Sequence, residues 1–204
     1  MTKSWPSRRT APAVRKGDLR EREILDAAER LLGTHGYAQM TVGDIAAEAG
    51  MTRGALYFYF ASKQDVLTAL VARTVQALQE KSGAAVANTA PVAEVVSATL
   101  ERTAELWRQH GVVMRAAVDL GSSVPEIDEL WTGTAEVFAD AIAAILGRSG
   151  VPMGDGPDDA AALGRVLCWM IERSFYRASK VSIAELDAAT LTCRAVWMRV
   201  AQSP

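Results

Sequence analysis

The chain has 204 residues, of which half are hydrophobic, and it carries a formal net charge of −2. This composition excludes an intrinsically disordered chain and predicts a globular protein with one large core, or with a small domain followed by a larger one. The charge is uneven, because residues 1–64 hold ten Lys and Arg against seven Asp and Glu, whereas residues 65–204 hold twelve against seventeen.

The first 18 residues form a basic arm in which Asp18 is the first acidic residue. Such an arm can follow a phosphate backbone or enter a minor groove, and the alternative is a solvated tail. The segment lacks the apolar stretch of a signal peptide and we find no apolar run of membrane-spanning length, so we expect a cytoplasmic protein with no membrane partner. The positive charges of the arm are Lys3, Arg8, Arg9, Arg15 and Lys16.

An amphipathic helix is expected to begin at Asp18 or Arg20 and to end near Gly36. Its apolar stripe consists of Ile24, Ala27, Ala28, Leu31 and Leu32.

Residues 41–63 have the pattern of two short helices joined by a tight turn. Thr41 is a good N-cap, and Asp44 can complete a capping box with it. Gly50 stands where the first helix must end in a left-handed conformation, and Thr52 is placed to cap the next helix. This spacing predicts a DNA-binding helix-turn-helix, with Leu56 and Phe60 directed to the core. Ser62 with Asp65 then caps a long helix.

Small or cationic residues at the start of the second helix suit base edges in a major groove, and nearby hydroxyls and a lysine suit phosphates. The alternative, three helices of an ordinary bundle, explains the caps but not the aromatic run 57–60 beside a lysine. We therefore expect base contacts from Arg53, Gly54 and Ala55, and phosphate contacts from Thr41, Thr52, Tyr57, Tyr59 and Lys63.

The rest of the chain predicts a larger helical body, so the fold is expected to be all-α. The last two expected helices are apolar over more than one stripe, which favours a homodimer that pairs them in a four-helix bundle. The alternative is a helix buried centrally in the monomer. Helices are expected at 62–81, 91–109, 112–120, 125–147, 158–179 and 183–201, with a break at 82–91 and a loop at 154–157.

No catalytic or metal-binding motif is found, so we expect neither an enzyme nor a cofactor. Cys168 and Cys193 are expected to be reduced, and apolar neighbours should keep Cys168 unreactive. Large aromatic residues and one methionine concentrate in the body, where they could fill a core or, with small residues between them, line a cavity for an apolar ligand. The residues of this group are Trp107, Met114, Trp131, Phe138, Trp169, Phe175 and Trp197.

The segment 41–63 resembles the N-terminal domain of TetR-type transcriptional regulators. The matching positions are Thr41, Val42, Asp44, Ile45, Ala46, Gly50, Gly54, Leu56, Tyr57, Phe60, Ser62 and Lys63. The resemblance implies an all-helical homodimer whose larger domain binds a small molecule that weakens binding to a double-stranded DNA operator. The expected domains are an arm (1–18), a three-helix DNA-binding head (19–64) and a ligand-binding and dimerisation body (65–204).

A weaker similarity extends to the ethionamide-resistance branch of that family, through residues 57–60, 129–131 and 172–173. It implies that Thr103, Trp107, Trp131, Cys168, Ile171 and Trp197 lie near an elongated pocket. Ile171 departs from the polar residue of that branch and removes a hydrogen-bonding group, so a more apolar effector is as plausible as the ligand class of that branch. The full set of expected ligand-binding residues is Thr103, Trp107, Met114, Trp131, Phe138, Cys168, Ile171, Phe175 and Trp197.

Taken together, these patterns predict a ligand-responsive repressor that binds a palindromic operator as a dimer. Two alternatives stay open: a small-molecule carrier or scavenger of the same fold that does not bind DNA, and a transcriptional activator.

Overall fold

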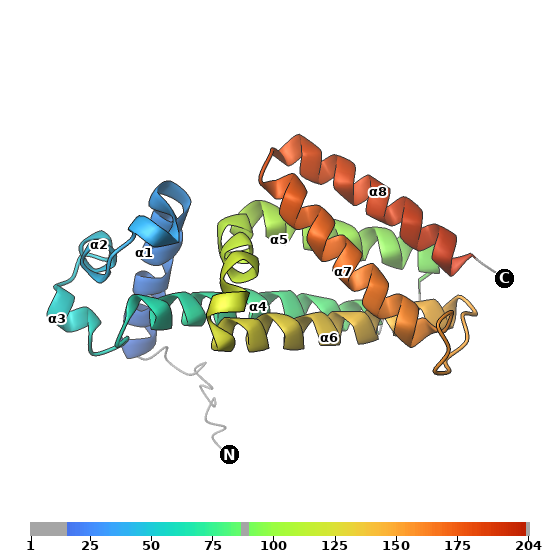
Figure 1. Ribbon diagram of the computed structural model, residues 1–204, viewed down its shortest axis with the longest axis horizontal. Helices are drawn as coiled ribbons and strands as arrows, with labels where there is room; N and C mark the ends of the chain where they lie inside the picture. Colours follow the sequence, from blue (N-terminus) through green and yellow to red (C-terminus); the bar gives the residue numbers. More distant parts are fainter. Residues whose placement is uncertain (1–15, 87–89, 203–204) are drawn as a thin grey trace, which may run out of the picture. The chain divides into compact units, whose positions relative to one another are not determined.

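The computed structural model describes residues 16–86 and 90–202, and all regular structure within these ranges is helical (Figure 1). The expected all-α fold is confirmed. Two compact units divide the chain, Met1–Val66 and Leu67–Pro204. The elements are α1 (Lys16–Gln39), α2 (Val42–Glu48), α3 (Arg53–Leu56), α4 (Lys63–Val86), α5 (Val92–Leu120), the 3-10 turn η1 (Gly121–Ser123), α6 (Pro125–Arg148), α7 (Ala160–Ser179) and α8 (Ile183–Ala201).

The first helix begins earlier than expected, because α1 already includes Lys16 at the end of the basic arm. Residues 1–15, which hold the remaining positive charges of that arm, lie outside the described residues. Gly36 interrupts the helical backbone with a φ of 72°, a left-handed conformation that glycine adopts without steric cost. The helix is therefore interrupted near its expected end, although α1 continues to Gln39. Ile24 and Ala28 of its apolar stripe are fully buried.

The larger unit is built around α7, which packs against α5, α6 and α8. The closest approach is between α6 and α7, at Gly164. A Cβ atom added there would lie 2.6 Å from the carbonyl oxygen of Ala139 and 3.1 Å from the backbone nitrogen of Ala143. Only a residue without a side chain permits this separation, so Gly164 sets the spacing of the two helices that form much of the core.

Two further expected boundaries differ from the structure. The segments 91–109 and 112–120 form one helix, α5, which bends at His110, where φ is −121° and ψ is 21°. A glycine after His110 suggested a break, but the flanking residues of both parts are buried in the same core and keep the helix continuous. Likewise α4 continues to Val86, beyond the expected end at Lys81. Part of the expected break at 82–91, residues 87–89, lies outside the described residues.

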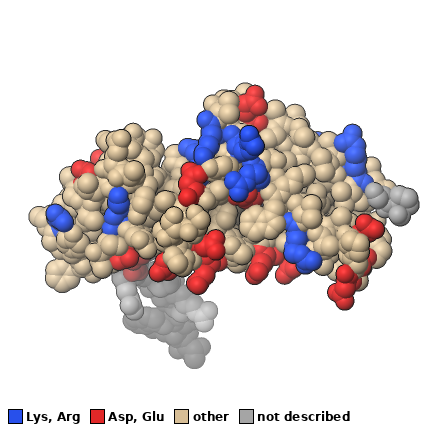
Figure 2. Space-filling model, in the orientation of Figure 1, with Lys and Arg blue, Asp and Glu red and all other residues tan. Residues whose placement is uncertain are grey.

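One helix among the described residues, α6, is long and apolar enough to cross a membrane by length and hydropathy alone, contrary to our expectation of none. Its packing against α5 and α7 is that of a core helix. The outer face carries exposed carboxylates, including Glu129, Glu136 and Asp140. Acidic side chains follow the lower edge of the larger unit, where α6 lies (Figure 2). Its composition thus reflects burial of one face in the protein core.

Candidate DNA-binding surface and ligand pocket

The helix-turn-helix begins with a complete capping box. The backbone nitrogen of Asp44 donates to Thr41 Oγ1 at 3.2 Å, and the backbone nitrogen of Thr41 donates to Asp44 Oδ2 at 2.9 Å. The Thr41 hydroxyl also donates to Asp44 Oδ2, and these bonds hold the pKa of the carboxyl below its usual range. Gly50, at φ 65°, reverses the chain after α2, as predicted. The box thus fixes the start of α2, with Ile45 and Ala46 buried.

The second helix is a single turn. Thr52 caps it by accepting from the backbone nitrogen of Ala55 at 3.2 Å, and Leu56 is its one buried residue. The exposed Arg53 donates from Nε and Nη2 to the Tyr57 hydroxyl at 3.2 and 2.9 Å, and its guanidinium lies 5.5 Å from the centre of the Tyr57 ring. The ring therefore holds Arg53 in one direction at the surface, beside the exposed Gly54.

The ammonium group of Lys63 is held by contacts within the protein and does not extend freely into solvent. Its Nζ donates to the carbonyl oxygen of Tyr37 at 2.9 Å and lies 4.3 Å from the centre of the Tyr37 ring. Because an ammonium group has three donors, two others are available for a phosphate. Lys63 thus links the first turn of α4 to the end of α1, and a DNA contact would add to that link.

The aromatic run after α3 divides as the sequence indicates, with Phe60 buried and Tyr57 and Tyr59 partly exposed. Phe58 was not among the expected DNA-binding residues, yet it is 92% exposed, more than any other large hydrophobic residue described. The sequence signal for this exposure was the position of Phe58 between two tyrosines on a short turn. An apolar ring at this surface suits the methyl group of thymine or a deoxyribose.

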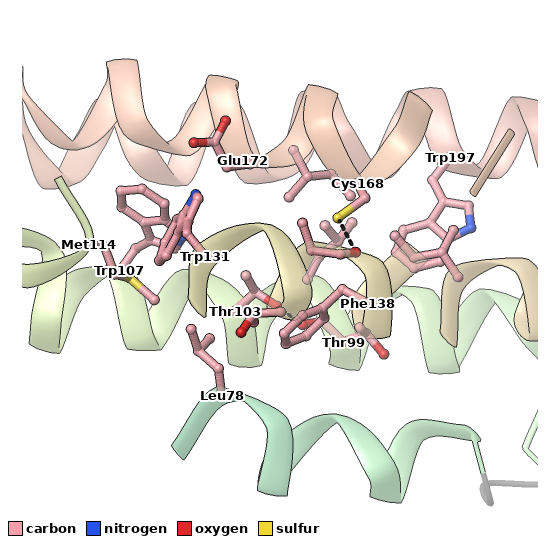
Figure 3. Close-up of a pocket in the computed structure, with 15 residues that line it drawn as sticks. Leu78, Thr99, Thr103, Trp107, Met114, Trp131, Phe138, Cys168, Glu172 and Trp197 are labelled. Atoms are coloured by element: carbon pink, nitrogen blue, oxygen red, sulfur yellow. Dashed lines mark hydrogen bonds between the residues drawn. The ribbon is translucent and has the colours of Figure 1, made fainter. Parts of the chain in front are cut away.

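A largely apolar pocket lies inside the larger unit, between α4, α5, α6, α7 and α8 (Figure 3). Its empty volume is about 660 Å³, a figure that includes space open to solvent. Eight of the nine expected ligand-binding residues line it. They are Thr103, Trp107, Met114, Trp131, Phe138, Cys168, Ile171 and Trp197.

The ninth expected residue, Phe175, does not line the pocket. It is fully buried behind the wall, where its ring meets Trp107 edge-on with centroids 6.5 Å apart. Trp107 in turn meets Trp131 edge-on at 6.4 Å. Phe175 therefore supports the orientation of Trp107, and Trp107 lies between Phe175 and the pocket.

Seven lining residues were missing from the expected set, although several lie one helical turn from a member of it. Thr99 precedes Thr103 by four positions, Ile142 follows Phe138 by four, and Glu172 follows Cys168 by four. Residues at this spacing share a helix face, so the signal was present in the sequence. The residues that were missed are Leu78, Thr99, Leu100, Thr134, Ala135, Ile142 and Glu172.

Two ionisable groups in the pocket are shifted by burial. The Cys168 thiol donates to the carbonyl oxygen of Ala135 at 3.4 Å, and burial, with the nearby charge of Glu172, raises its pKa to about 12. It is thus an unreactive thiol, as expected. Burial also raises the pKa of Glu172, although the charge of Arg173 and a hydrogen bond from the Trp131 indole act to lower it. No cluster able to hold a metal ion occurs within residues 16–86 and 90–202.

Residues 24–70 match the family described as bacterial regulatory proteins, tetR family. The regulator EthR of Mycolicibacterium smegmatis is 32% identical over 148 residues, which cover 72% of this chain and 68% of EthR. The transcriptional repressor LfrR of the same organism is 30% identical over 181 residues, covering 84% of this chain and 86% of LfrR. The chain belongs to the TetR family of bacterial regulators.

Solved TetR-fold structures extend the agreement to both units. A TetR-family regulator from Streptomyces coelicolor superposes with a TM-score of 0.71 at 18% identity, covering 90% of this chain and 82% of that one. FadR of Bacillus subtilis, in complex with stearoyl-CoA, gives 0.68 at 19%, covering 86% and 96%. As a member of the TetR family, the protein is a DNA-binding transcriptional regulator and not an enzyme.

Proposed function

We propose that this TetR-family protein is a ligand-responsive repressor that binds a palindromic operator as a homodimer and is released by a small, largely apolar effector. The observation that carries the proposal is the presence in one chain of a capped helix-turn-helix and a separate pocket whose lining is almost entirely apolar. The related protein LfrR of Mycolicibacterium smegmatis is a transcriptional repressor, which favours repression over activation for this protein.

For the DNA-binding half, Arg53, Gly54 and Ala55 would meet base edges in the major groove. Arg53 is exposed and already oriented by Tyr57, so little side-chain freedom would be lost on binding. The phosphate contacts would come from Thr41, Thr52, Tyr57, Tyr59 and Lys63, and the basic arm would add affinity that does not depend on sequence.

The dimer would form through α7 and α8. Both helices expose large apolar side chains although their other faces are buried in the core: Val166 is 66% exposed and Trp169 44% on α7, and Leu191 is 65% exposed on α8. Pairing these two helices with those of a second copy would form a four-helix bundle with an isologous interface. Two copies would provide the two heads that a palindrome requires.

The switch would act through α4. This helix runs without interruption from Lys63 to Val86, and its Leu78 lines the pocket. An effector that displaces Leu78 would therefore act on the helix whose first turn is bonded to Tyr37 in the head. The effector can release DNA only to the extent that it binds the free form more tightly than the operator-bound form. Since this function requires access to the chromosome, we place the protein in the cytoplasm.

The proposal is tested by a gel shift with DNA flanking the protein's own gene, carried out over a series of salt concentrations. A repressor with these phosphate contacts should bind a specific fragment, and its affinity should fall steeply as salt rises. A transcription assay on the same fragment separates repression from activation. A carrier of the same fold would bind apolar ligands but retard no fragment, and that result would refute the DNA-binding half of the proposal.

A further inference from the structure

The apolar pocket holds one carboxylate with an unsatisfied oxygen. The side chain of Glu172 is 11% exposed. The Trp131 indole donates a hydrogen bond to this carboxylate, yet its Oε2 is enclosed without a hydrogen-bond partner among the described residues. Arg173 Nε lies 3.7 Å away, too far for a hydrogen bond. The guanidinium of Arg173 instead lies 5.0 Å from the centre of the Tyr176 ring. Arg173 therefore moderates the charge of Glu172 without satisfying the oxygen.

Nothing in the local structure of α7 explains an acidic residue at this position. Glu172 lies in the C-terminal half of α7 (Ala160–Ser179), where the helix dipole does not favour negative charge. An enclosed acceptor without a donor lowers the stability of the folded protein, and burial of the carboxylate adds to that cost. A leucine would fill the same space without this penalty. An unsatisfied polar group in a native core calls for an explanation outside the fold itself.

The position of Glu172 in the pocket indicates what that explanation is. Glu172 lies toward the end where Trp107 and Trp131 lie, and the pocket continues from there along Phe138 (Figure 3). The charge of Glu172 also acts on the Cys168 thiol, one turn away in the same wall. The pocket thus has a hydrogen-bond acceptor at one end and an apolar length beyond it.

We propose that Glu172 is the polar anchor of the effector site, and that the effector is an elongated apolar molecule whose head group donates a hydrogen bond to this carboxylate. The inference rests on the proposed function, in which this pocket holds the effector. An ionised carboxylate only accepts hydrogen bonds, so an amide, a hydroxyl or an ammonium head is suited to it. A head group that only accepts finds no donor at Glu172, and an anionic head meets a like charge.

The test uses three probes with the same apolar chain and different heads. Decanamide donates, methyl decanoate only accepts, and decanoate is anionic. Their dissociation constants are measured by titration calorimetry on the full-length protein, on Glu172→Leu and on Glu172→Gln. Glu136→Gln is the matched control, because it removes an exposed carboxylate that does not line the pocket. Melting curves without probe establish that each variant is folded.

The wild type and Glu136→Gln should bind decanamide roughly tenfold more tightly than methyl decanoate, with decanoate the weakest, because a hydrogen bond to a charged group is formed only by the amide. Glu172→Leu should remove the preference for decanamide and improve the binding of decanoate. Glu172→Gln can both donate and accept, so it should bind the ester more tightly than the wild type does.

Equal affinity for the three probes in the wild type, or an unchanged order in folded Glu172→Leu, would overturn the anchor while leaving the pocket as a ligand site. No binding of any probe to the wild type would overturn the effector half of the proposed function together with the anchor. A Glu172→Leu variant that fails to fold leaves the decision to Glu172→Gln, whose affinity for the ester must rise for the proposal to stand.

Discussion

Replacing Gly164 by alanine tests whether the contact between α6 and α7 determines the shape of the pocket. The new Cβ would lie 2.6 Å from the carbonyl oxygen of Ala139 and 3.2 Å from the Cβ of Ala143, so α6 and α7 must move apart. Each of these alanines is the sequence neighbour of a pocket-lining residue, Phe138 and Ile142 respectively. The pocket should therefore change together with the stability of the larger unit.

The size of the effect follows from two opposing contributions. Overpacking in a close contact costs roughly 1–3 kcal/mol, whereas alanine is intrinsically better than glycine in a helix by about 1 kcal/mol. Together they leave a net loss of about 0–2 kcal/mol in the free energy of unfolding. We expect the upper half of this range, about 1–2 kcal/mol, because backbone atoms on the opposing helix cannot rotate away. For a protein of this size, this corresponds to a melting temperature lower by about 2–8 °C.

The assay is thermal unfolding, followed by calorimetric titration of an apolar probe. The matched control is Gly133→Ala, also within a helix, where an added Cβ would meet no atom within 4 Å. That change should raise stability by up to about 1 kcal/mol through helix propensity alone. If Gly164→Ala were as stable as Gly133→Ala and bound the probe like the wild type, the argument that Gly164 sets the spacing of α6 and α7 would be refuted.

The other predictions concern the two binding surfaces. Arg53→Ala should change which operator is preferred in a binding-site selection, and an unchanged preference would exclude a base contact. Lys63→Ala should weaken binding to all DNA sequences and reduce the slope of log affinity against log salt concentration by about one unit. The melting temperature should also fall because the bond to Tyr37 is lost, whereas unaltered DNA affinity would contradict the phosphate contact. Deletion of residues 1–15 should leave a folded dimer with weaker binding and a shallower salt dependence, whereas identical binding curves would make the arm a solvated tail. Trp131→Ala should weaken effector binding while operator binding survives; a purely structural tryptophan would instead cost roughly 3–5 kcal/mol of stability and leave the effector response unchanged.

Local signals in the sequence determined the helix-turn-helix. The capping box of Thr41 with Asp44, the left-handed Gly50 and the cap at Thr52 each involve residues within a few positions of one another, so their geometry is set before any tertiary contact forms. The same holds for Ser62, whose Oγ accepts from the backbone nitrogen of Asp65 at 3.1 Å, as predicted. These features could be predicted because the interacting residues lie within a few positions of one another in the sequence.

Tertiary structure decided the contacts that the spacing of residues along the chain does not determine. The sequence, through its aromatic residues and its resemblance to a known family, identified eight of the fifteen residues that line the pocket. It could not separate Trp107, on the surface of the pocket, from Phe175, which packs behind it. Both positions are buried and aromatic, and only the packing of α5 against α7 distinguishes them. Nor could it show that Glu172 Oε2 would be enclosed without a partner, or that Gly164 would face the backbone of α6. A sequence shows which face of a helix is apolar, whereas the atoms opposite that face come from elsewhere in the chain and are fixed only when the helices pack.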